Sequence, residues 1–110
     1  MLGVPYRPGG SSPRGFDCSG LVNYSYKHAG IKVPRTSSQQ YAQAKKLTRR
    51  DLQPGDLVFF NLKGRKISHV GIYLDNGRFI HAPSSGKSVS IDSLSNPYWN
   101  ARYRGAGHYF

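Results

Sequence analysis

The chain has 110 residues, a length that suits one domain with a single hydrophobic core, and we expect that domain to occupy residues 1–110. Hydrophobic residues make up 37% and charged residues 19% of the sequence, which excludes an intrinsically disordered protein. No apolar run approaches the roughly 20 residues that span a bilayer, and the first residues lack the pattern of a signal peptide. Residues 1–5 resemble the end of a helix, so we expect its start, and any targeting segment, to be missing from this sequence.

The charge is strongly positive, with 16 Lys and Arg residues against five acidic residues and a net charge of +11. Such a field attracts polyanions: nucleic acid, anionic lipid or acidic cell-wall polymer. The basic residues are dispersed along the chain, and no nucleic-acid-binding motif accompanies them. A nucleic-acid-binding protein is therefore an alternative that rests on charge alone, and steeply salt-dependent binding would support it.

The first half of the chain reads as loop and helix. Residues 3–15 are rich in Gly, Pro and Ser and predict an ordered loop. From Cys18 onward, small or apolar residues recur at helical spacing until Gly30, which predicts a helix with a glycine stop. The segment Thr36-Ser37-Ser38-Gln39 has capping-box spacing and predicts a second helix through about Ala44.

The second half reads as strands. The predicted strands are Leu57 to Phe60, Ile67 to Leu74, Arg78 to His81, Ser88 to Ile91 and Tyr103 to Phe110. Helices followed by a run of antiparallel strands indicate an α+β domain and not a doubly wound sheet.

The only cysteine, Cys18, lies where the glycine turn at Gly15 leads into the first predicted helix. The helix N-terminus stabilises negative charge, so we expect it to lower the pKa of this thiol. A thiolate beside backbone N–H groups is a nucleophile next to half of an oxyanion hole. The alternative is that Cys18 is a small buried hydrophobic residue.

A cysteine nucleophile needs a base, and four histidines are available. His69 and His81 lie on the two strands of a predicted hairpin. A two-residue Asn76-Gly77 turn would place them on opposite faces of the sheet. A three-residue loop over Asp75 to Gly77 would make them diagonal neighbours on one face, so the catalytic interpretation predicts the odd-length loop.

Other interpretations of the histidines stay open. His69 and His81 are alternatively half-buried strand residues, or zinc ligands together with Cys18, with or without Asp17, although no close-spaced ligand pair supports zinc. For His28 and for His108 near the chain end we expect a surface position.

Five motifs occur in one order: Pro5-Tyr6-Arg7 with Gly9-Gly10 and Gly15 to Val22; Pro34-Arg35-Thr36-Ser37 with Gln39-Gln40; Leu52 to Phe60; Ser68 to Tyr73; and Phe79-Ile80-His81-Ala82. Together they resemble the NlpC/p60 cysteine peptidases, from about residue 3 to residue 110. The resemblance implies a papain-like α+β fold, with N-terminal helices packed on an antiparallel sheet of about five to six strands.

The same resemblance implies the catalytic residues. Cys18 corresponds to the nucleophile, His69 to the base and His81 to the third catalytic residue, which orients the base. Tyr6 occupies the position whose hydroxyl completes the oxyanion hole with the backbone N–H of Cys18. The alternative for Tyr6 is an aromatic ring that packs a loop.

Two further residues correspond to the substrate cleft beside the nucleophile, Asp17 and Ser19. Asp17 is alternatively a helix cap, and the two roles are compatible. Ser19 is alternatively an ordinary serine of a first helical turn.

The implied function is a peptidoglycan endopeptidase that needs no cofactor or metal. Asn96-Pro97-Tyr98-Trp99 with Arg102-Tyr103 resembles the Gram-negative D,D-endopeptidase branch, which cuts D-Ala to meso-diaminopimelate crosslinks; Tyr98 and Trp99 are also expected to anchor the core. Alternatives are a γ-D-Glu to diaminopimelate endopeptidase, including an effector or phage wall hydrolase, and an amidase or acyltransferase of the same fold. A binding module that lost activity is a further alternative, although none of the three catalytic positions is changed.

The expected partners are peptidoglycan stem peptides and the anionic cell wall, without nucleic acid, and the expected state is a monomer. The expected location is periplasmic or associated with the outer membrane, with secretion as an alternative.

Overall fold

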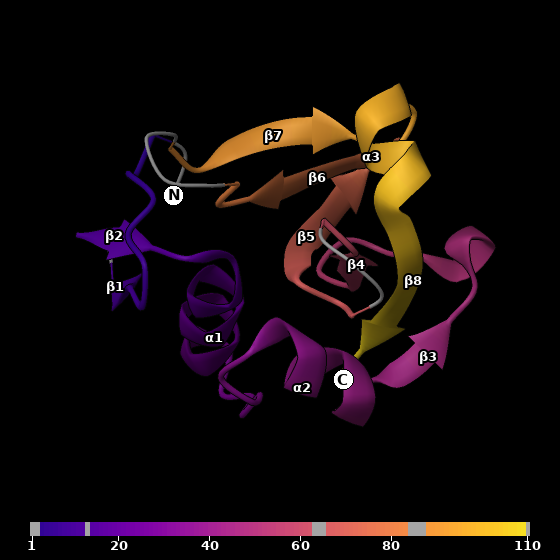
Figure 1. The fold of residues 1–110 in the computed structure, drawn as a ribbon. Helices are drawn as coiled ribbons and strands as arrows, with labels where there is room; N and C mark the ends of the chain where they lie inside the picture. The colour runs from indigo at the N-terminus through magenta and orange to yellow at the C-terminus, as the bar shows by residue number, and fades with distance from the viewer. Residues whose placement is uncertain (1–2, 13, 63–65, 84–87, 110) are drawn as a thin grey trace.

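The computed structural model describes residues 3–12, 14–62, 66–83 and 88–109, and it shows three α-helices and two β-sheets in that part of the chain (Figure 1). The helices are α1 (Cys18–His28), α2 (Ser37–Gln43) and α3 (Pro97–Arg102), with a 3-10 turn, η1, at Arg49–Asp51. The strands are β1 (Ser11–Ser12), β2 (Gly15–Phe16), β3 (Lys45–Leu47), β4 (Leu57–Phe60), β5 (His69–Asp75), β6 (Arg78–His81), β7 (Ser90–Ser93) and β8 (Tyr103–His108).

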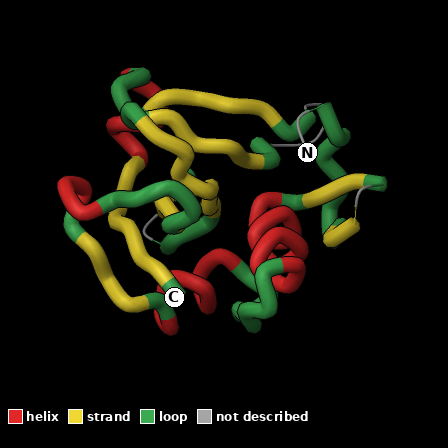
Figure 2. Tube along the Cα trace, turned by 180° about the vertical axis from the view of Figure 1, so that it is seen from behind, coloured by secondary structure: helices red, strands yellow, loops and turns green. Residues whose placement is uncertain are grey.

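The main sheet is antiparallel, with strand order β3-β8-β4-β5-β6-β7, and β1 and β2 form a small separate pair. Helix α1 packs against β5, and α2 lies between α1 and the sheet's lower end (Figure 1). Seen from behind, the strands of the main sheet curve around one side of the molecule, and α1 lies on the other side with the small β1–β2 pair (Figure 2). The α+β class predicted from the sequence is confirmed.

Strand β4 is buried on both of its faces, which explains its unbroken apolar sequence. Leu57 and Phe59 join the core cluster that contains the α1 residue Val22. Val58 and Phe60 point to the other face, where they join the cluster of Phe79, Leu94 and Trp99. The sheet is therefore covered on both sides near its centre, and the site residues on β5 lie beside its most buried strand.

Helix α1 begins at Cys18 because the preceding residue, Asp17, caps it. The Asp17 carboxylate accepts a hydrogen bond of 2.7 Å from the backbone N–H of Gly20. Gly20 has no room for a side chain, since a Cβ there would lie 1.9 Å from the carbonyl oxygen of Gly10. This contact holds the N-terminal loop against the first helical turn, and so fixes the position of Cys18.

The β5–β6 hairpin has the register that the catalytic interpretation requires, but a bulge produces this register and not the predicted three-residue loop. Tyr73 pairs with Phe79, as the three-residue loop predicted. At the tip, however, Asp75 pairs with Arg78 around a two-residue Asn76-Gly77 turn, and both turn residues have positive φ. A register shift between Tyr73 and Asp75 converts the pairing at the tip into the pairing found along the rest of the hairpin, because a β-bulge adds one unpaired residue to one strand.

Several short elements were not predicted. β1 and β2 lie within or beside the expected loop, β3 follows α2, and α3 follows β7. The predicted strand Ser88 to Ile91 is displaced, since β7 covers Ser90–Ser93. The helix end expected at residues 1–5 is not found at residues 3–5, where Gly3 donates to the carbonyl of Val89; Met1 and Leu2 lie outside the described residues.

No helix in the described ranges has the length and apolar character that crossing a membrane requires.

Candidate active site

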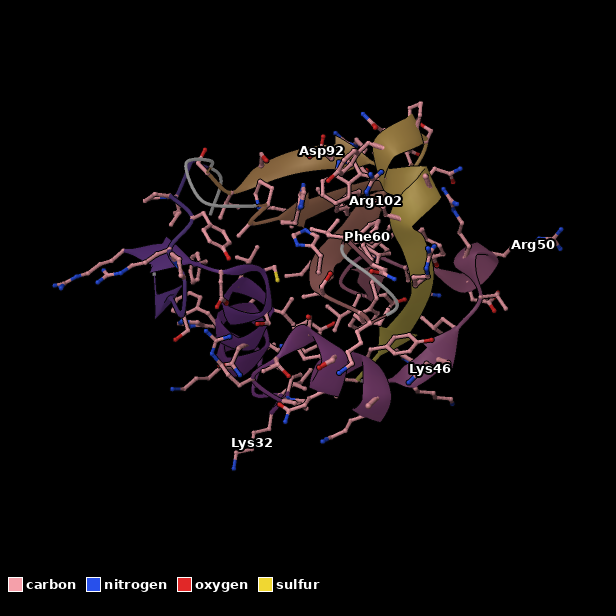
Figure 3. All side chains as sticks on the ribbon, viewed as in Figure 1. Lys32, Lys46, Arg50, Phe60, Asp92 and Arg102 are labelled. Atoms are coloured by element: carbon pink, nitrogen blue, oxygen red, sulfur yellow. The ribbon has the colours of Figure 1, made fainter. Side chains whose placement is uncertain are left out.

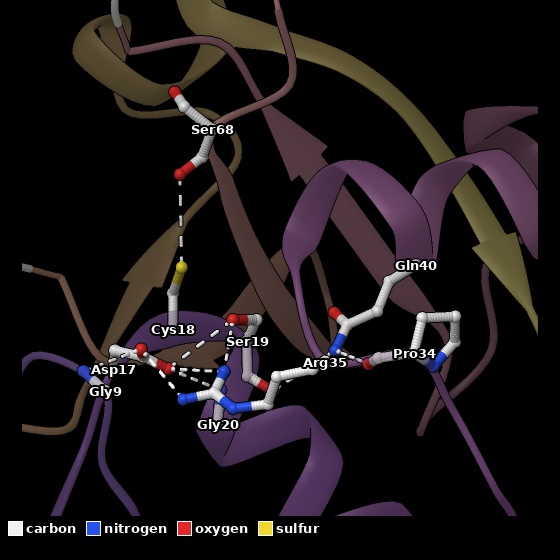
Figure 4. A network of polar contacts seen from close by, with 9 residues as sticks. All are labelled: Gly9, Asp17, Cys18, Ser19, Gly20, Pro34, Arg35, Gln40 and Ser68. Atoms are coloured by element: carbon white, nitrogen blue, oxygen red, sulfur yellow. Dashed lines mark hydrogen bonds and ion pairs between the residues drawn. The ribbon is translucent and has the colours of Figure 1, made fainter.

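The thiol of Cys18 lies at the N-terminal end of α1, against the beginning of β5. Its Sγ is 4.0 Å from the carbonyl oxygen of Ser68 (Figure 4), and the backbone N–H of Val70 also faces the sulfur. These two residues flank His69. The packing of α1 on β5 therefore brings the predicted nucleophile to the backbone that carries the predicted base.

The helix N-terminus acts to lower the pKa of Cys18 as expected, but the expectation of a lowered net pKa is wrong. Burial raises this pKa above its ordinary value, and the negative charge of Asp17 raises it further. Hydrogen bonds from the backbone at Val70, Ser19 and Cys18 act in the lowering direction but are outweighed. The resting sulfur therefore keeps its proton at neutral pH, and its activation depends on a neighbouring base.

His69 and His81 are brought together on one face of the sheet. Nε2 of His69 lies 2.7 Å from Nδ1 of His81, which is a hydrogen bond between two imidazoles. Gly71 allows this approach: a Cβ at Gly71 would lie 2.7 Å from the Phe79 ring and 3.3 Å from Cβ of His81. Both histidines are fully or almost fully buried, at 2% and 0% exposure.

Aromatic rings enclose the histidine pair. Trp99 stacks on His69 with centroids 5.3 Å apart and contacts His81 edge to face at 4.7 Å. The rings of Phe60 and Phe79 lie beside them. This burial, with the neighbouring charge of His81, lowers the pKa of His69 to about 3. Burial also lowers the pKa of His81, although Asp92 opposes that shift. At neutral pH both rings are neutral, as a general base must be.

Two residues of this site were missed by the sequence analysis. The Asp92 carboxylate lies 2.7 Å from Nε2 of His81, at the far end of the pair from Cys18; Figure 3 labels it on β7. The predicted strand ended at Ile91, two residues before the end of β7, and so left Asp92 out. Trp99 was expected in the core, which is confirmed, but its stacking on His69 carried no signal in the sequence. Tyr98, expected beside it in the core, is 49% exposed instead, because it sits on the outer side of α3.

The side chains of Asp17 and Ser19 are held in a network with Arg35 (Figure 4). Arg35 makes a bidentate contact with Asp17, at 3.0 and 3.1 Å, and donates to Oγ of Ser19 at 2.9 Å. Oδ2 of Asp17 also accepts from the backbone N–H of Gly9. The helix-cap interpretation of Asp17 is thus confirmed, whereas its substrate contact stays a prediction. Ser19 is buried, and its hydroxyl is already engaged.

Tyr6 lies close to the nucleophile. Its strand-like pairing with Phe16 places it beside the start of α1. Burial raises the pKa of Tyr6, and the charges of Cys18 and Asp17 raise it further, so its hydroxyl stays protonated and able to donate. Its predicted part in an oxyanion hole is consistent with this position.

The family model described as NlpC/P60 family matches residues 3–108 of this chain. The chain belongs to the NlpC/P60 family. The murein DD-endopeptidase MepH of Escherichia coli strain K12 is 51% identical over 111 residues, 96% of this chain and 41% of that protein. The gamma-DL-glutamyl hydrolase of Bacillus subtilis strain 168 is 49% identical over 107 residues, 94% of this chain and 26% of that protein.

A solved NlpC/P60 family protein from Bacillus cereus ATCC 10987 has the same fold, with a TM-score of 0.94 and 39% sequence identity. The similarity covers 99% of this chain and 36% of that one. The chain thus spans less than half the length of each of these three relatives.

The geometry of this NlpC/P60 site does not favour the zinc alternative. The two nitrogens that face each other in His69 and His81 are joined by a hydrogen bond, and Asp17 is paired with Arg35. Within the described ranges, no three His, Cys, Asp or Glu residues form a group that could hold a metal ion. Of the other histidines, His28 is exposed as predicted, whereas His108 is half-buried on β8.

Proposed function

We propose that this domain is a peptidoglycan endopeptidase of the cysteine peptidase class. The observation that carries the proposal is the position of Cys18, whose sulfur lies against the backbone on both sides of His69, while His69 is hydrogen-bonded to His81. A nucleophile, a neutral base and an orienting group in this order are the parts of an acyl-transfer site. Family membership supports the proposal independently, since one relative of this domain is named a murein DD-endopeptidase and another a gamma-DL-glutamyl hydrolase.

The proposed reaction begins with transfer of the Cys18 thiol proton to His69. The thiolate attacks a peptide carbonyl, and the N–H of Cys18 and the hydroxyl of Tyr6 donate to the oxyanion that forms. His69 then gives its proton to the leaving amine, which departs and leaves a thioester on Cys18. Water, deprotonated by His69, hydrolyses the thioester and restores the thiol.

As substrate we propose the D-Ala to meso-diaminopimelate crosslink. The name of the E. coli relative supports this bond, and the name of the B. subtilis relative supports a glutamyl bond as the alternative. The net charge of +11 favours encounter with stem peptides, which carry free carboxylates, and with an anionic wall. Outward-pointing basic side chains such as Lys32 and Arg50 in Figure 3 contribute to that field. This substrate implies a periplasmic, outer-membrane-associated or secreted location.

The test is a digest of defined muropeptides by the purified chain, with products resolved by mass. We expect crosslinked dimers to yield monomers with intact stems. Release of L-Ala-γ-D-Glu fragments instead would replace the proposed bond by the glutamyl one. If neither dimers nor monomers are cut, the proposed function is wrong.

Replacing Tyr6 with Phe removes only the hydroxyl proposed for the oxyanion hole. We expect kcat to fall about 100-fold with little change in KM, because one such donor acts mainly in the transition state. The measurement is steady-state cleavage of a muropeptide dimer. Tyr24→Phe, a half-buried tyrosine of α1 that packs on Phe16, is the matched control and should keep the parental kcat. Equal rates in both variants would remove Tyr6 from the mechanism.

A further inference from the structure

A line of three side chains crosses three neighbouring strands, and Asp92 is its outer end. In the β6–β7 register His81 lies opposite Ser90, so Asp92 is its diagonal neighbour on the same face. The β5–β6 register gives His81 the same diagonal relation to His69. Each link of the line is a contact of 2.7 Å. The sheet thus repeats one geometry twice, and connects an edge-strand carboxylate to the proposed base.

The chemistry of this line has only one consistent arrangement of protons. A carboxylate only accepts hydrogen bonds, so Nε2 of His81 must carry a hydrogen. A neutral imidazole has a single N–H, which leaves Nδ1 of His81 as an acceptor. Nε2 of His69 must therefore donate to it, and Nδ1 of His69 is left with a free lone pair. Nδ1 is the ring nitrogen nearer the backbone, and it is against this backbone that the sulfur of Cys18 lies.

Apart from the Cys18 thiol, no other polar group among the described residues is hydrogen-bonded to the two rings so as to make this choice. Among the described residues, the hydrogen bonds of the His69 and His81 rings are with each other and with Asp92, and the further ring contacts are with Phe60, Phe79 and Trp99. Aromatic hydrocarbon surface does not distinguish one imidazole tautomer from the other. Without the carboxylate, the same two rings could hydrogen-bond in the opposite sense, with an N–H at Nδ1 of His69 where a base is needed.

We propose that Asp92 is a positioning residue that sets the tautomer of both imidazoles and so leaves Nδ1 of His69 free to take the thiol proton of Cys18. The inference rests on the proposed function, since it gives that reaction its proton acceptor. Asp92 is suited to this part because its side chain is 36% exposed. Water reaches the carboxylate, so the group is not fully desolvated, while the rings between it and the sulfur are buried.

The test is Asp92→Asn, which keeps the shape but lets the group donate as well as accept. We expect nitrogen NMR of the histidine side chains to show Nε2–H on His69 and His81 in the parent, and Nδ1–H or a mixture in the variant. Protonated and unprotonated ring nitrogens resonate far apart, and the signals can be assigned with His28→Gln and His108→Gln. We also expect kcat to fall about 100-fold with KM within about twofold. This is less than the ~10⁴-fold loss known when a carboxylate touches the catalytic imidazole itself, because Asp92 acts through one further ring.

The matched control is Asp75→Asn, which removes one negative charge from an exposed ion pair with Arg78 on the same hairpin. We expect it to leave both the tautomers and kcat at parental values. The proposal is overturned if Asp92→Asn keeps the parental tautomers, or if its kcat matches that of Asp75→Asn. A loss of melting temperature and activity without a tautomer change would assign Asp92 a structural role only, and would also overturn it.

The NMR measurement needs no substrate, so it separates this inference from the proposed function. If the parent cuts no muropeptide but the tautomers change as expected, the proposed substrate fails and the role of Asp92 in setting the tautomers stands. If the parent cuts its substrate and Asp92→Asn changes neither readout, only the inference fails.

Discussion

Replacing Cys18 with Ala is expected to lower kcat about 10⁵-fold or more. Loss of a covalent nucleophile removes the whole acylation route, and in other hydrolases of this kind it costs about as much as removing the entire catalytic group. The fold should be unaffected, because Cys18 is only partly buried and Ala is a good residue for the first turn of α1. Muropeptide cleavage and a urea unfolding curve measure the two effects.

A second measurement uses the fact that Cys18 is the only cysteine. Iodoacetamide can modify one thiol in each molecule, so residual activity should fall linearly with the labelled fraction and reach zero at one label per chain. Ser38→Ala, at an exposed residue in the first turn of the neighbouring helix α2, is the matched control for the Ala variant and should keep full activity. Activity that survives complete labelling would assign the reaction to another residue.

The elements with strong local signals were predicted well. Cap and stop residues act within one helical turn, so Thr36 and Gly30 marked their helix ends correctly. The double-sided burial of β4 was visible as an uninterrupted apolar run. The short elements β3 and α3 lacked such signals, because strand pairing with β8 and packing of Trp99 hold them in place. Contacts between residues far apart in sequence decide these segments.

In the site, too, the features that depend on local sequence were predicted, and those that depend on contacts between distant residues were not. The facing of His69 and His81 could be worked out from hairpin geometry, and the correct register was chosen, although a bulge produced it and not the odd-length loop. The pKa of Cys18 was predicted in the wrong direction, because the helix-terminus argument is local whereas desolvation depends on how β5 covers the thiol. Asp92 was missed because the predicted strand was displaced by two residues from β7. The predicted strand therefore did not include Asp92, the diagonal neighbour of His81.

Replacing His69 with Gln is expected to lower kcat about 10⁴-fold, because the amide can still donate to Nδ1 of His81 but cannot accept a proton from Cys18. His28→Gln, on the exposed end of α1, is the control and should keep the parental kcat. Activity within tenfold of the parent in the His69 variant would mean that another group deprotonates the thiol.

The same variant is also expected to change how stability depends on pH. The unfolded chain protonates His69 near its ordinary pKa of 6.5, whereas the folded chain does so only near pH 3. Between these values the unfolded state binds more protons, so the free energy of unfolding falls as the pH falls below 6.5, by up to about 1.4 kcal/mol per pH unit for one histidine. His81 adds a contribution of the same sign, because its folded pKa is also lowered. His69→Gln removes one of the two contributions, so urea unfolding between pH 7 and pH 5 should show a shallower loss than in the parent. An unchanged dependence of the free energy of unfolding on pH would mean that His69 is accessible to protons in the folded state. The neutral base that the mechanism needs would then have to form through a change in structure when substrate binds.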